Sequence, residues 1–146
     1  MSQGRRANTS GRFAEDAVVG ALKARGCELK RQVVLGTNLY GSDLRVDVLI
    51  SNLVPYPHGL VVESKWQDQE GSADEKYPYL VENIRTCFPV PAIVVLHGNG
   101  YRDGACRWLR SQVDGQKLVA VFNFEEFMSW LLRIKDDQIT SSRLFV

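Results

Sequence analysis

The segment GLVVESKWQ, residues 59–67, places a glutamate and a lysine inside a run of residues that otherwise predicts a buried β-strand. Successive side chains of a strand point to opposite faces, so Glu63 and Lys65 share one face. Burying a charge that has no partner costs several kcal/mol. The two charges therefore indicate either a structural ion pair or a site that uses both of them.

A third charge lies inside the preceding strand pattern, GSDLRVDVLIS, residues 41–51. Alternation places Val46, Val48 and Ile50 on one face of this strand and Asp47 on the other. If the two segments pair as a hairpin, Asp47 lies close to Glu63. Two carboxylates a few ångströms apart repel each other unless a cation lies between them. A hard divalent ion with carboxylate and carbonyl ligands meets this requirement.

The remaining pattern predicts an α/β fold. Apolar residues at helical spacing predict a helix in residues 11–26, which Gly26 ends. The wholly apolar run PAIVVLHG, residues 91–98, is typical of a central strand that is covered on both faces. Further strands are predicted in residues 28–36 and 117–123, and further helices in residues 71–88, 104–113 and 124–135. This order predicts three layers, with a central mixed sheet flanked by helices on both faces.

The length of 146 residues suits one domain, which we place at residues 11–146 after a flexible, basic N-terminal arm at residues 1–10. No apolar run is long enough to span a membrane, and the N-terminus lacks the apolar stretch of a secretory signal. We therefore expect a cytoplasmic protein without a membrane partner. Three widely spaced cysteines support neither a disulfide framework nor a zinc site.

The first predicted helix contributes another acidic residue. On a helical wheel Glu15 lies at the border of the apolar face, whereas Asp16 points about 100° further round, toward solvent. Glu15 is therefore placed to reach the same pocket as Asp47. Taken alone, a glutamate at this position is more often a solvated helix residue than part of a site.

An acidic residue on a first helix, followed by Asp47 and by the triplet ESK at residues 63–65, resembles the PD-(D/E)XK nuclease superfamily in element order as well as in motif. The pair Val46 and Asp47 takes the place of the "PD". The segment KWQ followed by GSADEKYPY is similar to that of small restriction-type and phage-associated members. The resemblance implies a restriction-endonuclease-like fold.

The resemblance also implies roles for individual residues. Asp47, Glu63 and the backbone carbonyl of Ser64 would bind Mg²⁺, with Mn²⁺ able to take its place. Lys65 would orient or activate the attacking water. Glu15 would assist, and Gln67 would match a polar residue often found two places beyond the lysine.

These observations predict a Mg²⁺-dependent DNA endonuclease, a metal-dependent phosphodiesterase that acts as a homodimer on duplex or branched DNA. One small subunit with one site cuts one strand at a time, which favours two-fold symmetry. Two alternatives remain open: a catalytically silent nuclease-fold module that binds DNA or protein, and an RNA-directed nuclease of the same fold. The residues expected to contact DNA are Arg5, Arg6, Arg12 and Lys76.

Overall fold

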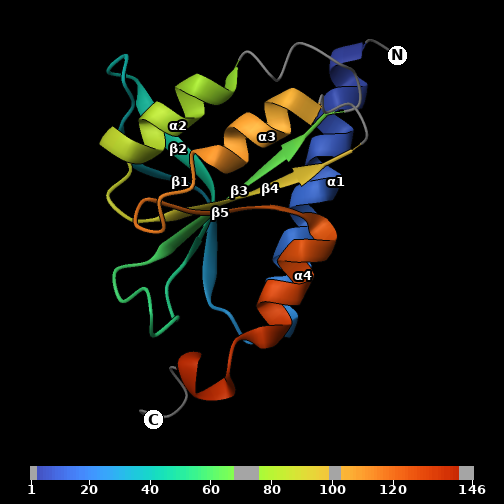
Figure 1. The fold of residues 1–146 in the computed structure, drawn as a ribbon. Coiled ribbons are helices and arrows are strands. Elements are labelled where there is room, and N and C mark those ends of the chain that lie inside the picture. Colours follow the sequence, from blue (N-terminus) through green and yellow to red (C-terminus); the bar gives the residue numbers. More distant parts are fainter. Residues whose placement is uncertain (1–2, 68–75, 99–102, 142–146) are drawn as a thin grey trace.

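The computed structural model describes residues 3–67, 76–98 and 103–141, and it confirms the three-layer α/β architecture (Figure 1). Helices and strands follow the predicted order. They are α1 (Gln3–Ala24), β1 (Leu29–Thr37), β2 (Asp43–Ile50), β3 (Leu60–Trp66), α2 (Tyr77–Thr86), β4 (Ala92–His97), α3 (Asp103–Ser111), β5 (Leu118–Asn123), α4 (Phe124–Arg133) and the short 3-10 helix η2 (Asp136–Gln138).

The five strands form one mixed sheet in the order β1-β2-β3-β4-β5. The first three strands are antiparallel, and β3, β4 and β5 are parallel. The two parallel connections run through α2 and α3. Because both connections step across the sheet in the same direction, right-handed crossovers put both helices on the same face.

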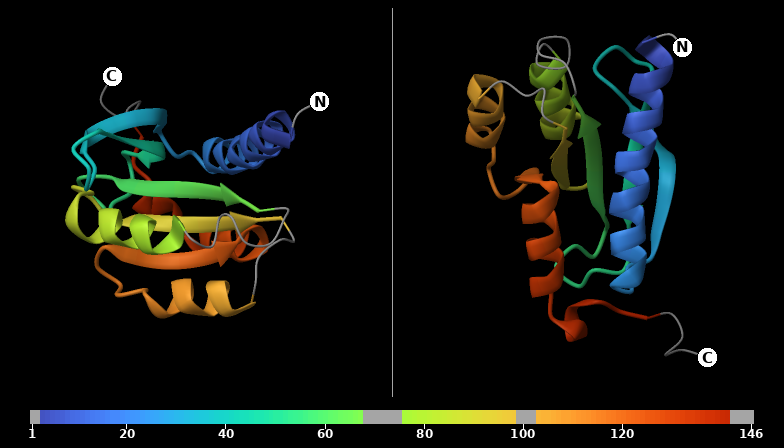
Figure 2. Two further views of the ribbon diagram at one scale, coloured as in Figure 1. Left: turned by 90° about the horizontal axis from the view of Figure 1, so that it is seen from above. Right: turned by 90° about the vertical axis from the view of Figure 1, so that its right-hand side faces the viewer.

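The helices lie on both faces of the sheet (Figures 1 and 2). On each face they bury a separate core. Helices α2 and α3 cover one face, where Ile84 and Leu109 are fully buried. Helices α1 and α4 cover the other face through Leu22, Phe127 and Leu131. Every residue of β4 is buried, which confirms that this apolar segment is a central strand. Its side chains alternate between the two cores, as a strand covered on both faces requires.

Strands β2 and β3 pair only over part of their length. The pairing with β2 involves Leu60, Val61 and Val62 of β3, whereas the pairing with β4 continues to Trp66. From Glu63 onward, one edge of β3 therefore lacks a backbone partner on β2. We call this divergence of β2 and β3 the fork.

The fork changes the faces that strict alternation predicts. Val48 packs with α1 and α4, but Val46 packs in the core under α2 and α3. The expectation that both valines share one face is therefore wrong. The reason lies in the neighbouring strand, where Gln32 stands between the residues that pair with Val46 and Val48 and has a φ of +52°. Beyond this break in extended geometry, the tip of the β1–β2 hairpin contacts α2, where the N–H of Leu39 donates to Oδ1 of Asn83 at 3.0 Å and the ring of Tyr40 stacks on Tyr79.

The segment before residue 11 also differs from the prediction of a flexible arm. Helix α1 begins at Gln3, so residues 3–10 are helical rather than a flexible arm. This segment contains no proline, and its glutamine, arginine and alanine residues are compatible with a helix, so nothing in it forces an end before Gly26. Gly26 does end the helix, with a φ of +94°. Although α1 has 22 residues, no helix in the described part of the chain is long and apolar enough to cross a membrane.

Gly98 fixes the end of β4 against the end of β3, and this contact provides a test of the fold. A Cβ atom at Gly98 would overlap the carbonyl oxygen of Gln67, and the φ of Gly98 is +89°. We expect Gly98→Ala to lower the free energy of unfolding by about 3 kcal/mol, measured by urea denaturation. Gly115→Ala is the matched control because Gly115 has a φ of +75° but open space around it. A loss of about 1 kcal/mol is expected there, and equal losses in both variants would contradict the close approach.

Candidate active site

The fork is closed by two carboxylates, which make the hydrogen bonds that a backbone ladder would otherwise supply. The backbone N–H of Ser64 donates to Oδ2 of Asp47 at 2.8 Å. The backbone N–H of Asp47 donates to Oε1 of Glu63 at 3.3 Å. Each carboxylate is thus attached to the opposite strand. The two side chains lie together, as hairpin pairing of these strands predicts.

Glu63 has an unusual electrostatic environment. It is 4% exposed, and burial raises the pKa of its carboxyl group to about 8. Lys65 opposes this shift, whereas the charge of Asp47 and a hydrogen bond with Asp47 add to it. Near neutral pH the buried carboxyl group therefore holds a proton in the cation-free protein.

Lys65 lies on the same face of β3 as Glu63. Its Nζ atom is 3.2 Å from Oε2 of Glu63, and its side chain is 37% exposed. An ammonium group that remains in contact with water contributes little to an ion pair. Because the pKa of Glu63 stays raised beside Lys65, this pair does not offset the burial of the carboxylate. The geometry disfavours the interpretation of ESK as a stabilising structural ion pair.

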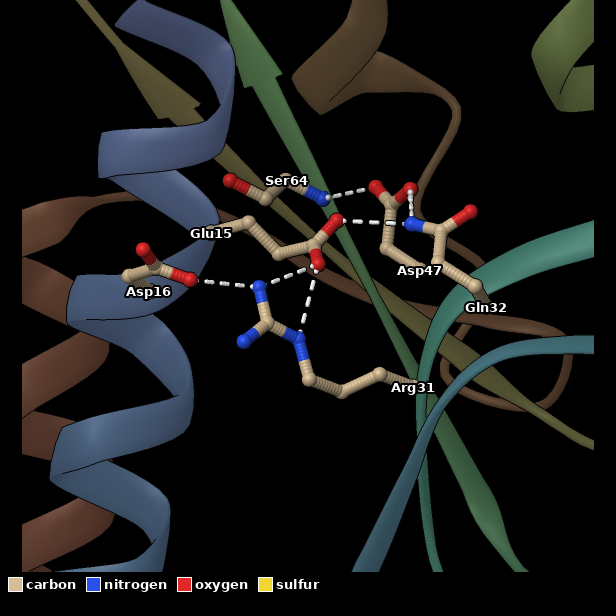
Figure 3. Close-up of polar contacts among 6 residues, drawn as sticks. All are labelled: Glu15, Asp16, Arg31, Gln32, Asp47 and Ser64. Carbon is tan, nitrogen blue, oxygen red and sulfur yellow. Dashed lines mark hydrogen bonds and ion pairs between the residues drawn. The ribbon is translucent and has the colours of Figure 1, made fainter. Parts of the chain in front are cut away.

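Glu15 reaches the fork through a glutamine (Figure 3). Arg31 donates two hydrogen bonds to Oε2 of Glu15, at 2.9 and 2.6 Å, and one to Asp16 at 2.6 Å. Gln32 donates from Nε2 to Oε1 of Glu15 at 2.8 Å and to Oδ1 of Asp47 at 3.3 Å. The first helix is therefore tied to the fork. Within the described ranges, however, no three histidine, cysteine, aspartate or glutamate side chains are grouped so that they could hold a metal.

Sequence reasoning missed Arg31 and Gln32 as parts of this site. The signal that could have revealed them is the run Lys30, Arg31 and Gln32 inside a predicted strand. Three successive polar residues break the alternation of a half-buried strand, and such a break is typical of a bulge or a local change of direction.

Two pockets flank the fork. One, of about 500 Å³, is lined by Arg12, Glu15 and Asp47 together with Gly11, Arg31, Gln32 and Ser64. The other, of about 460 Å³, contains Glu63, Lys65 and Lys76 among its lining residues. Successive residues of β3 point to opposite faces, so the pockets open on opposite faces of this strand. One cationic side chain expected to contact DNA, Arg12 or Lys76, lies in each pocket.

The remaining predicted residues lie apart from the fork or outside the description. Gln67 is buried and lines neither pocket, and its backbone N–H donates to the carbonyl of His97 at 3.0 Å. Arg5 and Arg6 belong to α1, but their side chains lie outside the described part of the chain. The carbonyl of Ser64 points to the same strand edge as its N–H group, which faces Asp47.

Comparison with known proteins identifies the family to which this site belongs. The family model of the PD-(D/E)XK nuclease superfamily domain matches residues 6–135. The chain belongs to the PD-(D/E)XK nuclease superfamily. The matched range includes most of α1, the fork and the ESK triplet. The mixed sheet with helices on both faces is consistent with the restriction-endonuclease-like fold of this superfamily.

Similarity to other proteins is remote. No curated protein matches the chain. Among solved structures, the crystal structure of AF1548, titled a protein of unknown function, matches with a TM-score of 0.46 and 15% sequence identity. The match covers 76% of this chain and 55% of that one, so the chain spans little more than half the length of AF1548.

The raised pKa of Glu63 predicts how stability depends on pH in this member of the superfamily. Because the pKa is about 8 in the folded protein and ordinary in the unfolded chain, only the folded state holds this proton between about pH 4.5 and 8. The contribution of this proton to the free energy of unfolding is fully present below about pH 4.5 and is lost as the pH rises through about 8. We expect the melting temperature in EDTA to fall across this range, and to fall less in Glu63→Gln.

Glu82→Gln is the matched control for this measurement, because Glu82 is an exposed carboxylate on α2 and should retain the wild-type pH profile. Parallel profiles of Glu63→Gln and wild type would contradict the assignment of a raised pKa to Glu63.

Proposed function

We propose that this chain is a Mg²⁺-dependent DNA endonuclease. The observation that carries the proposal is the pair of carboxylates at the fork, Asp47 and Glu63, held together by backbone hydrogen bonds and flanked by Lys65. Membership of a nuclease superfamily supports phosphodiester hydrolysis as the reaction. The proposal adds the cation, the substrate and the residues that act.

The donor set suits a hard divalent cation. Mg²⁺ is commonly bound through one or two carboxylates, with water and substrate phosphate completing its ligands. Asp47 and Glu63 supply two carboxylates, and the backbone carbonyl of Ser64 on the same strand edge is a neutral oxygen donor. When bound, Mg²⁺ polarises the scissile phosphate and lowers the pKa of an attacking water. Mn²⁺, which accepts the same oxygen ligands, is expected to substitute for it.

Lys65 supplies a positive charge beside the acidic pair. Its partly exposed ammonium group borders the pocket that contains Glu63. From this position it can hold an attacking water by a hydrogen bond and stabilise the negative charge that develops on the phosphate. Gln67 is kept in the proposal only as a neighbour of the motif, because it lines neither pocket.

DNA as the substrate and a homodimer as the active form are further parts of the proposal. One chain with one fork cuts one strand at a time, so cutting both strands of a duplex or a branched junction favours two copies related by a two-fold axis. Sedimentation of the protein with and without DNA tests this state. Matched DNA and RNA substrates separate the proposal from an RNA-directed nuclease, and a silent binding module would cut neither.

Two substitutions separate cation binding from chemistry. Asp47→Asn removes a proposed ligand without changing shape, so we expect it to lose both Mn²⁺ binding and Mg²⁺-dependent cleavage of plasmid DNA. Lys65→Met leaves the carboxylates in place. It should retain Mn²⁺ binding while cleavage slows by about a hundredfold or more. Calorimetric titration and plasmid nicking measure the two properties on the same preparations.

Asp137→Asn controls for the loss of one exposed carboxylate, far along the chain on η2, and should behave like wild type in both measurements. Wild-type cleavage in Asp47→Asn would remove the fork from the mechanism. A rate in Lys65→Met within threefold of wild type would remove the lysine.

The cationic side chains of the two pockets should contact phosphates. Each phosphate contact with duplex DNA contributes about 0.9 to the slope of log binding constant against log salt concentration. We expect Arg12→Gln and Lys76→Gln each to reduce that slope by about one unit, in fluorescence anisotropy titrations with Ca²⁺ in place of Mg²⁺. Arg133→Gln, at the end of α4, removes an exposed charge outside both pockets and serves as the control. Slopes that match the control would argue against phosphate contacts at Arg12 and Lys76.

A further inference from the structure

Gln32 has a backbone conformation that its residue type rarely adopts. Among the residues that the structure describes, it is the one non-glycine residue with a positive φ, at +52°. Left-handed backbone geometry is sterically unfavourable for a side chain with a Cβ, and such strain concentrates at functional sites. A glycine would adopt the same geometry without strain. The presence of a glutamine at this strained position therefore points to a use for its amide.

The amide lies between two carboxylates. Nε2 of Gln32 donates to Oε1 of Glu15 at 2.8 Å and to Oδ1 of Asp47 at 3.3 Å (Figure 3). The NH₂ end of the amide is its donor end, and it faces a carboxyl oxygen of each residue. The left-handed turn at Gln32 directs the amide to this position, opposite Asp47 in the β1–β2 register.

Among the described residues, no other hydrogen bond connects Glu15 to Asp47. The second oxygen of Glu15, Oε2, is held by Arg31, which also binds the exposed Asp16. Arg31 makes no hydrogen bond to Asp47, so it would hold Glu15 equally well without Asp47. The bond from Gln32 is the one that brings Glu15 toward Asp47.

We propose that Gln32 is a positioning residue, whose amide links the carboxylate of Glu15 to Asp47 so that helix α1 helps to orient Asp47 in the cation site of the fork, without supplying a third ligand. The inference rests on the proposed function. It deepens that function by assigning the residue that makes Glu15 part of the site. Gln32 itself touches neither cation nor substrate in this role.

The test is a double-mutant cycle on the full chain, with Mn²⁺ binding measured by calorimetric titration. Gln32→Gly removes the amide and accepts the positive φ, so the protein should melt in EDTA at the wild-type temperature or above. We expect Gln32→Gly and Glu15→Gln each to weaken Mn²⁺ binding by about tenfold, as loss of a group that orients a ligand does. The double variant should bind no more weakly than either single variant, because without the amide Glu15 no longer contributes.

A second variant, Gln32→Asn, tests whether the effect of Gln32→Gly comes from the backbone of glycine rather than from the loss of the amide. Asparagine tolerates left-handed geometry, but its amide is one methylene shorter and cannot span both carboxylates. Gln32→Asn should therefore match Gln32→Gly. Gln116→Gly, at an exposed glutamine away from both pockets, is the control for removal of an amide. Mn²⁺ affinity in Gln32→Gly within twofold of wild type, or losses that multiply in the double variant, would overturn the inference.

Cleavage assays on the same proteins distinguish this inference from the proposed function. A wild type that binds Mn²⁺ but cuts no DNA refutes the endonuclease proposal, while weaker binding in Gln32→Gly still supports the positioning role. A wild type that binds Mn²⁺ and cuts, with a Gln32→Gly variant that does both equally well, overturns only the inference. A wild type that binds no Mn²⁺ overturns both.

Discussion

The separation of β2 from β3 at Asp47 and Glu63 is the constraint on which the rest of the structure depends. A strand edge that lacks a backbone partner needs other hydrogen-bonding groups, because unpaired buried N–H groups are costly. The two carboxylates meet this need by accepting from Asp47 and Ser64 across the fork. The same bonds hold two acidic groups side by side at a position that opens on a pocket from each face. The two hydrogen bonds that stabilise the separated strands are thus the ones that hold the proposed cation ligands in place.

The arrangement is unfavourable for the cation-free protein and favourable for a cation. Burial raises the pKa of Glu63, and the adjacent charge of Asp47 raises it further, while Lys65 only partly compensates. A divalent ion that binds only the folded state would remove this penalty and stabilise the protein by mass action. The strained conformation of Gln32 fits the same account, because local strain is tolerated where it positions a functional group.

The periodicity of the sequence predicts much of the fold, for clear physical reasons. The apolar run of β4 and the apolar spacing of α1 follow from burial on two faces and on one face, respectively. Asp47, Glu63 and Lys65 could be placed together because alternation and hairpin pairing are local rules. The details of the strands around the fork could not be predicted in this way. The different cores of Val46 and Val48 accompany the positive φ of Gln32 on the neighbouring strand, a local break in extended geometry that no pattern of period two encodes. The helical state of residues 3–10 was missed because polar, basic residues suit both a helix and an arm.

The central claim is that the fork binds a divalent cation through its two carboxylates. A crystal structure of the wild-type protein grown with Mn²⁺, with anomalous diffraction measured near the manganese edge, tests it most directly. The account predicts one strong anomalous peak at about 2.1–2.3 Å from carboxylate oxygens of both Asp47 and Glu63, with the carbonyl of Ser64 turned toward it. A fork without a peak, with the hydrogen bond between Asp47 and Glu63 intact and manganese bound elsewhere, would contradict the account.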